Sequence, residues 1–326
     1  MEIVRLGRSG LNVSRISLGA MGFGDKSWRS WVLDEAEAKP IVKRALDLGI
    51  NLVDTCNFYS KGASEMLLGR LLKGTIRRDD VVIATKFGFT MGPSANEKGY
   101  SRKHIVEAVE GSLRRLGVDH IDLYQTHIWD PSTNLEEMVQ ALADLVRAGK
   151  VLYVGATDIP AWQLVKAVYL AKAAGLPGFA SLQYHYNAIW REAEREAMPF
   201  CRDEGIGLLP YSPAARGFLS GPQRRSGPGQ TERARTDSYA NEWYGRDSDG
   251  IVADVLQAIA KARGVSPSQV AIAWVLRQPG VHAPIIGATR LEHVEEAVAA
   301  TKIELAQEEL AQIDAAYLPR REIRHA

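Results

Sequence analysis

The sequence predicts an α/β protein, a (β/α)8 TIM barrel with an N-terminal β-hairpin and long loops at the C-terminal face. Eight short apolar runs, most of them rich in β-branched residues, have the length and composition of buried parallel strands. Amphipathic stretches with apolar residues at i, i+3 and i+4 separate most of these runs. Because no shift in composition marks a linker, we expect a single domain over residues 1–326.

The predicted elements follow one another in a regular order. A hairpin comes first, with its turn between Gly7 and Gly10. The eight strand candidates cover residues 16–19, 50–54, 81–86, 121–127, 151–156, 180–184, 207–211 and 283–287. The predicted helices between them cover residues 34–48, 64–72, 101–116, 135–148, 161–174 and 191–204. This alternation favours a closed barrel over a doubly wound sheet.

Residues typical of helix ends support these boundaries. Ser101 precedes the helix that its side chain would cap. Pro160 and Pro267 stand where a first helical turn tolerates proline. Five of the predicted helices are followed directly by a glycine that can end them, namely Gly49, Gly117, Gly149, Gly175 and Gly205.

Composition indicates an intracellular globular protein. With 46% hydrophobic residues and 40 basic against 39 acidic side chains, the chain can bury a large core and has no excess charge for nucleic acid or membrane binding. No apolar run approaches the roughly 20 residues of a membrane span, and the charged N-terminus does not resemble a signal peptide. We therefore expect a cytoplasmic location. The sequence does not predict an oligomeric state.

Two cysteines, Cys56 and Cys201, are too few for a disulfide framework or a thiolate metal site, so no metal is expected. Cys56 lies close to other polar residues and could be taken for a nucleophile. No base is placed near it in the sequence to activate it, and we interpret it as a packing residue.

Residues that can move or hold a proton stand at the ends of three successive predicted strands. Asp54, Lys86 and His127 end these strands, and Tyr59 follows Asp54 by five residues. Any one of them is more often a surface or capping residue than a catalyst. Their shared orientation is harder to attribute to chance, because the active sites of such barrels lie at the C-terminal ends of the strands.

These side chains can together protonate a carbonyl oxygen. A tyrosine is a poor acid near neutral pH because its ordinary pKa is about 10. A neighbouring Lys86 would lower that pKa, and Asp54 would keep the lysine charged and fixed. His127 could donate a second hydrogen bond to the same oxygen. A hydride donor is missing, so a nicotinamide cofactor is expected. The sequence has no G-x-G-x-x-G or Walker loop to bind it, and the spacing of residues 19–24 is wrong for one.

The longest stretch that we predict to be irregular runs over residues 221–250. It is rich in Gly, Ser and Arg and contains several aromatic residues, among them Tyr239, Trp243 and Tyr244. Its arginines are Arg224, Arg225, Arg233 and Arg235. A long loop in a compact domain is usually functional or disordered. The arginines are therefore either solvated surface residues or groups that close over an anionic ligand.

Five dispersed motifs resemble those of the aldo-keto reductases. They are Asp54-Thr-Cys-Asn-Phe-Tyr59, Ala84-Thr-Lys86, Asp122-Leu-Tyr-Gln-Thr-His127, Pro210-Tyr-Ser-Pro-Ala-Ala-Arg-Gly-Phe-Leu-Ser-Gly221 and Pro284-Ile-Ile-Gly-Ala-Thr-Arg290. They cover nearly the whole chain in order. The stretches 127–130 and 185–196 are similar to the bacterial YajO-like and potassium-channel β-subunit-like branch. The resemblance implies a catalytic tetrad of Asp54, Tyr59, Lys86 and His127, with Tyr59 as the general acid.

The resemblance also implies a nicotinamide nucleotide site. Tyr211 would stack on the nicotinamide ring, while Gln183 and Thr157 would hold its carboxamide. The full set of expected cofactor residues is Met21, Asp54, Thr157, Gln183, Tyr211, Ser212, Pro213, Gly217, Leu219, Gly287, Thr289, Arg290, His293 and Glu296. For each of them a structural role is the alternative. Asp158 stands where many members have Asn or Ser, and a carboxylate cannot donate as an amide does. Recognition of a 2′-phosphate would fall on Arg290 with His293 in support, so NADPH is expected over NADH.

Aromatic residues of the loops at the same face would line the substrate pocket, although each could equally serve packing. The candidates are Trp28, Trp31, Phe58, Phe87, Phe89, Trp129, Trp243 and Tyr244. They suggest a fairly large apolar or multi-ring aldehyde or ketone, with a sugar-derived aldehyde still open. Two other functions remain open. One is an NADPH-binding sensor or channel-associated subunit with little turnover, and the other is a nicotinamide-independent barrel enzyme that acts on a phosphosugar.

Overall fold

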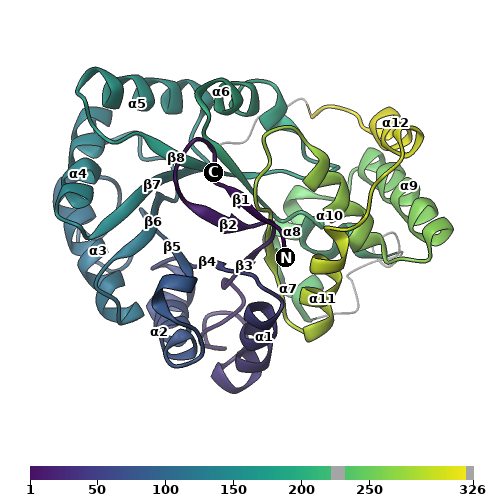
Figure 1. Ribbon diagram of the computed structural model, residues 1–326, viewed down its shortest axis with the longest axis horizontal. Helices are drawn as coiled ribbons and strands as arrows, with labels where there is room; N and C mark the ends of the chain where they lie inside the picture. Colours follow the sequence, from purple (N-terminus) through teal and green to yellow (C-terminus); the bar gives the residue numbers. More distant parts are fainter. Residues whose placement is uncertain (222–231, 321–326) are drawn as a thin grey trace.

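The computed structural model, which describes residues 1–221 and 232–320, shows a closed barrel of eight parallel strands (Figure 1). Around the barrel the strand order is β10-β3-β4-β5-β6-β7-β8-β9. Their bounds are β3 Ser17–Gly19, β4 Leu52–Asp54, β5 Val82–Phe87, β6 Ile121–Thr126, β7 Val151–Thr157, β8 Phe179–His185, β9 Gly207–Tyr211 and β10 Ile285–Gly287. All eight predicted strands and the predicted barrel are confirmed.

The predicted hairpin is also confirmed and covers one end of the barrel (Figure 1). Strands β1 (Ile3–Arg5) and β2 (Asn12–Ser14) pair antiparallel. Leu6, next to β1, packs against barrel residues that include Leu52 and Leu209. The turn approaches the chain before β9 so closely that a Cβ on Gly7 would lie 2.3 Å from the Gly205 carbonyl oxygen. With its φ of +60°, this position requires glycine.

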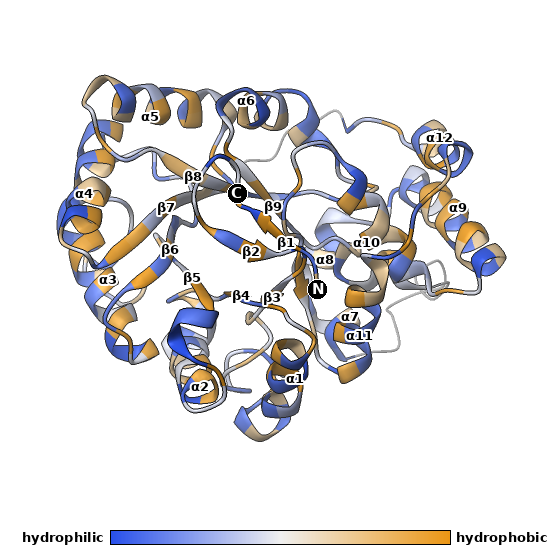
Figure 2. Cartoon of the chain, in the orientation of Figure 1, coloured by the Kyte–Doolittle hydropathy of each residue, from blue (hydrophilic) through white to orange (hydrophobic). Residues whose placement is uncertain are grey.

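Helices surround the barrel and carry hydrophobic and hydrophilic residues in alternation, as Figure 2 shows for α4 and α9. Their bounds are α1 Glu35–Asp47, α2 Ala63–Leu72, α3 Arg102–Leu116, α4 Leu135–Arg147, α5 Ala161–Ala173, α6 Ala197–Glu204, α9 Asp247–Arg263, α10 Pro267–Arg277, α11 Leu291–Ala300 and α12 Gln307–Ala316. Ser101 caps α3 by accepting a hydrogen bond from the amide of His104. The five glycines predicted to end helices all have a positive φ. Within the described ranges no helix is long and apolar enough to cross a membrane.

One predicted helix is shorter than expected. Residues 191–204 form a 3-10 turn, η3 (Glu192–Glu194), followed by α6. A continuous helix would place Pro199 in its interior, where proline has no N–H to donate to the preceding turn. Beginning the helix at Ala197 places Pro199 in the first turn, where that donor is not needed.

The prediction that residues 221–250 are irregular is wrong for much of that range. It contains α7 (Glu232–Thr236) and α8 (Ser238–Trp243), and α9 begins within it. Both short helices are too short to show an apolar period, and buried Asp237 caps α8 by accepting from the amide of Ala240. Arg224 and Arg225, expected to be either solvated surface residues or groups that close over an anionic ligand, lie outside the described residues.

The strand register directs the polar side chains into the barrel. Leu52, Ala84 and Leu123 belong to the apolar cluster that packs against the hairpin, whereas Val53 and Ile83 belong to the cluster beneath the helices. Side chains two residues apart in a strand share one face. Two positions after Leu52, Ala84 and Leu123 stand Asp54, Lys86 and Gln125. These polar side chains therefore also point into the barrel, at its C-terminal end.

Candidate active site

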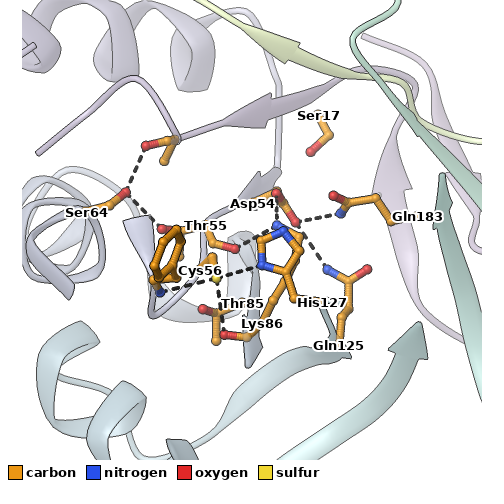
Figure 3. Close-up of polar contacts among 12 residues, drawn as sticks. Ser17, Asp54, Thr55, Cys56, Ser64, Thr85, Lys86, Gln125, His127 and Gln183 are labelled. Carbon is orange, nitrogen blue, oxygen red and sulfur yellow. Dashed lines mark hydrogen bonds and ion pairs between the residues drawn. The ribbon is translucent and has the colours of Figure 1, made fainter. Parts of the chain in front are cut away.

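An ion pair between Lys86 and Asp54 lies at the centre of the site (Figure 3). The Lys86 Nζ is 2.5 Å from Asp54 Oδ1 and donates at 2.9 Å to the carbonyl oxygen of Thr55. The lysine side chain is completely buried and that of the aspartate is 5% exposed. Burial is the largest single effect and acts to lower the pKa of Lys86, but the charge of Asp54, its hydrogen bond and the neighbouring Tyr59 and Cys56 together outweigh burial, and the pKa is raised. Lys86 is therefore an ammonium ion throughout the neutral range.

Two amides fix the other oxygen of Asp54. Gln183 Nε2 donates to Asp54 Oδ2 at 2.9 Å and Gln125 Nε2 donates at 3.2 Å. The structure places the amide nitrogen of Gln183 on Asp54, and the expected contact of this residue with a carboxamide stays a prediction. Gln125 was missed by the sequence analysis. Its position in β6, two residues before His127, is the signal that places it on the inner face.

Tyr59 lies at the start of the 3-10 turn η1 (Tyr59–Gly62) that follows β4, beside Lys86 and His127. Lys86 Nζ is 5.1 Å from the centre of the Tyr59 ring, and the rings of Tyr59 and His127 meet edge to face at 5.6 Å. Burial raises the pKa of Tyr59 and outweighs the lowering by Lys86. The expectation of a net lowering is wrong, because desolvation is the larger effect. Tyr59 therefore holds its proton at neutral pH.

His127 follows β6 and is neutral. Burial, together with the charge of Lys86, holds its pKa well below the ordinary value. Its Nδ1 is 2.9 Å from the Sγ of Cys56 (Figure 3). The sequence places no base near Cys56, but strands β4 and β6 bring His127 to it from 71 positions away. Burial nevertheless raises the pKa of the Cys56 thiol to about 12, so it is not a thiolate nucleophile.

Three of the predicted substrate residues surround Tyr59 and His127. Phe58 stacks on Phe89 at 4.7 Å, and Phe89 meets the His127 ring edge to face at the same distance. Trp28 lies 6.0 Å from Phe58 and 6.3 Å from Tyr59 between ring centres. These aromatic side chains form an apolar border beside the proton-holding groups.

The other predicted substrate residues pack elsewhere. Trp31 is buried beneath the guanidinium of Arg233, and Trp129 packs edge to face against Tyr100. Trp243 lies 4.8 Å from the ring of His185, and buried Tyr244 hydrogen-bonds to the same histidine. Phe87 is completely buried and stacks on Tyr124, which leaves it no surface toward a ligand.

The residues predicted to hold a nicotinamide lie at the ends of β7 and β9. The Tyr211 hydroxyl donates to Asp158 Oδ2 at 3.0 Å, so the Asp158 carboxylate accepts from a protein group. Thr157 is buried, and its Oγ1 has no hydrogen-bond partner among the described residues. An unpartnered buried hydroxyl costs free energy, and a carboxamide would supply the missing partner. The residues present therefore fit the expected group.

The segment after β9 has left-handed backbone positions and involves two arginines, Arg216 with a buried side chain and the half-buried Arg233 of α7. Ser212 and Arg216 have φ values of 56° and 53°, and Gly217 has a φ of 91° with open space around it. Arg216 and Arg233 share one carboxylate, Asp237, at 2.8 and 3.2 Å. Burial and the charge of Arg216 lower the pKa of Arg233 to about 10. This local excess of positive charge suits a diphosphate. Of the remaining predicted residues here, Pro213 and Leu219 are buried, whereas Met21 is half-buried.

Arg290 and His293 lie together before and within α11. Arg290 Nη2 is 2.9 Å from His293 Nε2, while the amide of Thr289 donates to His293 Nδ1. No carboxylate pairs with Arg290 in the part of the chain that the structure describes. Glu296 is engaged with Ser268, whose hydroxyl donates to it at 2.6 Å. An exposed arginine that has a histidine beside it and no carboxylate partner among the described residues is suited to binding a phosphate group.

The geometry agrees with the motif resemblance, and comparison with known sequences decides the family. The sequence pattern of the Aldo/keto reductase family matches residues 15–318. This chain belongs to the aldo-keto reductases. It is therefore an oxidoreductase that interconverts carbonyl and alcohol groups. Among the described residues of this aldo-keto reductase, no cluster of His, Cys, Asp and Glu could hold a metal ion.

Fungal relatives are similar over nearly their whole length. The chain is 39% identical to the versiconal hemiacetal acetate reductase of Aspergillus parasiticus, over 98% of each chain. It is 38% identical to a putative aryl-alcohol dehydrogenase of Schizosaccharomyces pombe, over 96% of this chain and 95% of the relative. A putative aryl-alcohol dehydrogenase of Saccharomyces cerevisiae is 36% identical over 98% of each chain. The predicted bacterial branch stays a prediction.

The raised pKa of Asp158 predicts a pH-dependent stability for this aldo-keto reductase. Burial raises the pKa of Asp158 to about 7, against an ordinary 3.8 in the unfolded chain. A raised carboxyl pKa contributes stability below the unfolded value, which is lost as the pH rises through the folded value. We expect Asp158→Asn to increase the free energy of unfolding at pH 8 by roughly 1–2 kcal/mol, with little effect at pH 4. Asparagine also tolerates the left-handed backbone at this position.

Urea unfolding at both pH values measures this effect. Asp144→Asn is a suitable control, because Asp144 is an exposed carboxylate whose pKa is lowered by Arg102. That variant should lose a little stability at pH 8. An Asp158→Asn protein that is less stable than the parent at pH 8 would contradict the prediction.

Proposed function

We propose that the protein reduces a fairly large apolar or multi-ring aldehyde or ketone to the alcohol, with NADPH as the hydride donor and Tyr59 as the proton donor. The observation that carries the proposal is the buried Lys86–Asp54 ion pair beside Tyr59 and neutral His127. Lys86 can stabilise the phenolate that forms when Tyr59 gives up its proton. Burying such an ion pair costs free energy. This pair lies beside Tyr59, where the phenolate charge would appear.

Each of the four residues has a distinct task in this proposal. The nicotinamide, when bound, supplies the hydride. Tyr59 gives its proton to the carbonyl oxygen, and His127 donates a hydrogen bond to the same oxygen. Lys86 balances the phenolate charge at Tyr59. Asp54 keeps Lys86 charged, while Gln183 and Gln125 hold the carboxylate in position.

The cofactor site favours NADPH. Tyr211, Thr157 and the segment from Ser212 to Leu219 would hold the nicotinamide half and the diphosphate, and Gly287 and Thr289 would meet the adenosine. Arg290 and His293 would bind the 2′-phosphate, which NADH lacks. Two buried cysteines, both without a disulfide, suit the reducing cytoplasm that the proposal assumes.

Arg290→Ala tests the nucleotide preference. A charge-assisted hydrogen bond contributes about 1.5–3 kcal/mol, so we expect the Kd for NADPH to rise by roughly 10- to 100-fold. The Kd for NADH should change little, because its ribose carries no phosphate. Arg147→Ala, which removes a surface arginine on α4, is the control. Equal weakening of both nucleotides would contradict the assignment of Arg290.

The substrate class follows from Trp28, Phe58 and Phe89, whose rings border the reacting groups. Stacked aromatic side chains favour an apolar, flat carbonyl compound over a small polar one. The printed name of two relatives, putative aryl-alcohol dehydrogenase, agrees with aromatic compounds of this kind.

A titration followed by turnover assays tests the proposed function. NADPH and NADH are first added to the purified protein while tryptophan fluorescence is recorded. NADPH oxidation is then measured with aryl aldehydes, quinones, multi-ring ketones and small aliphatic aldehydes. We expect tight NADPH binding and the highest kcat/KM for aromatic carbonyl compounds. Tight binding without turnover would favour a nucleotide sensor, and absence of binding would favour a nicotinamide-independent enzyme.

A further inference from the structure

Cys56 is the closest polar neighbour of the histidine that faces the proposed substrate. Its Sγ lies 2.9 Å from His127 Nδ1, and the side chain is completely buried (Figure 3). His127 Nε2 has no hydrogen-bond partner in the described part of the chain, so the sulfur engages the ring on one side only. The ring packs between Tyr59 and Phe89, which limits its rotation.

The surroundings of the sulfur indicate where its proton points. The amide of Phe58 donates to Sγ at 3.3 Å, which occupies one lone pair of the sulfur. Three acceptors lie within reach of the single S–H: His127 Nδ1 at 2.9 Å, Asn57 Oδ1 at 3.5 Å and the Lys86 carbonyl oxygen at 3.6 Å. The nitrogen is by far the nearest of these acceptors. A thiol also keeps its proton in a site as buried as this one.

We propose that Cys56 is a positioning residue: its S–H donates a hydrogen bond to His127 Nδ1 and so keeps the imidazole proton on Nε2. This inference rests on the proposed function, in which His127 donates a hydrogen bond to the carbonyl oxygen. A neutral imidazole has one donor and one acceptor nitrogen. The hydrogen bond made by one nitrogen decides which nitrogen carries the proton.

The alternative tautomer would work against the reaction. If Nδ1 carried the proton and donated to Sγ, Nε2 would present a lone pair to the substrate. A lone pair repels the carbonyl oxygen, whereas an N–H would polarise the carbonyl group. The thiol thus contributes a single hydrogen bond, and no bond to sulfur forms or breaks.

Nitrogen-15 NMR of the full-length protein shows which imidazole nitrogen of His127 carries the proton. The measurement does not depend on enzymatic turnover. The His127 signals are assigned by their loss in His127→Asn. We expect Nδ1 to show the shift of an unprotonated acceptor and Nε2 that of a protonated nitrogen. Cys56→Ala should shift His127 toward a mixture of tautomers, and Cys56→Ser should restore the parent pattern because the hydroxyl is also a donor. A protonated Nδ1 in the parent protein would overturn the proposal.

Kinetics provide the second readout. Removing a positioning hydrogen bond should lower kcat for carbonyl reduction by about tenfold in Cys56→Ala, with an unchanged Kd for NADPH. Cys56→Ser should recover most of the loss. Cys201→Ala, at the other buried cysteine, controls for the loss of a buried thiol and should leave kcat unchanged. Thermal melting identifies any variant that fails to fold.

The outcomes separate this inference from the proposed function. A Cys56→Ala protein with the parent tautomer and the parent kcat would overturn the role of Cys56 while leaving the reductase intact. A parent protein that binds NADPH but reduces no carbonyl compound would contradict the proposed function. The NMR measurement on that same protein would still show whether Cys56 sets the tautomer.

Discussion

Tyr59→Phe should lower kcat for carbonyl reduction by about 1,000-fold, because general acid catalysis typically contributes 100- to 10,000-fold. The substitution removes only the hydroxyl. The phenyl ring keeps its packing against His127 and its position above Lys86. Burial keeps the hydroxyl of Tyr59 protonated at neutral pH, so the parent enzyme has its acid in the active form throughout that range.

NADPH binding should survive this change. Tyr59 follows β4, whereas the residues proposed to hold the nucleotide follow β7, β9 and β10. The Kd from tryptophan fluorescence should therefore match that of the parent. Tyr169→Phe is the matched control, because Tyr169 is an exposed residue of α5 whose hydroxyl donates to Glu204 at the end of α6. A Tyr59→Phe enzyme that reduces carbonyl compounds at the parent rate would refute Tyr59 as the acid.

The barrel could be predicted from the sequence because its determinants are local. Each strand is a short apolar run, and five helix ends carry a glycine that adopts a positive φ. Asp54, Lys86 and His127 could be grouped because each stands at the C-terminal end of a strand, where neighbouring parallel strands bring side chains together. Period-two alternation then carries Asp54 and Lys86 into the barrel.

Features that depend on distant contacts could not be predicted. The contact between Cys56 and His127 joins residues 71 positions apart, and the two amides that hold Asp54 come from β6 and β8. Helices α7 and α8 depend on Asp237, which caps α8 and pairs with Arg216 and Arg233. The net rise in the pKa of Tyr59 is another such case, because only the folded structure shows that burial exceeds the effect of Lys86.

Lys86→Met should both abolish reduction and destabilise the protein. Breaking a buried ion pair by removing one partner costs about 3–5 kcal/mol, because Asp54 is left as an unpaired buried carboxylate. Only the amide donors Gln183 and Gln125 would remain on it. Tyr59 would also lose the positive charge that lowers its pKa. Urea unfolding measures the stability, and NADPH oxidation measures the activity.

Two comparisons separate the contribution of the Lys86 charge to stability from the contribution of its packing. Lys43→Met removes a surface lysine paired with Asp47, and it should cost less than about 1 kcal/mol because exposed pairs contribute little. The double variant Lys86→Met, Asp54→Asn removes both buried charges, so we expect it to recover part of the lost stability. It should recover none of the activity, because no ammonium remains to stabilise the phenolate of Tyr59. If the double variant were as unstable as Lys86→Met alone, the lost stability would come from packing and not from the uncompensated charge of Asp54.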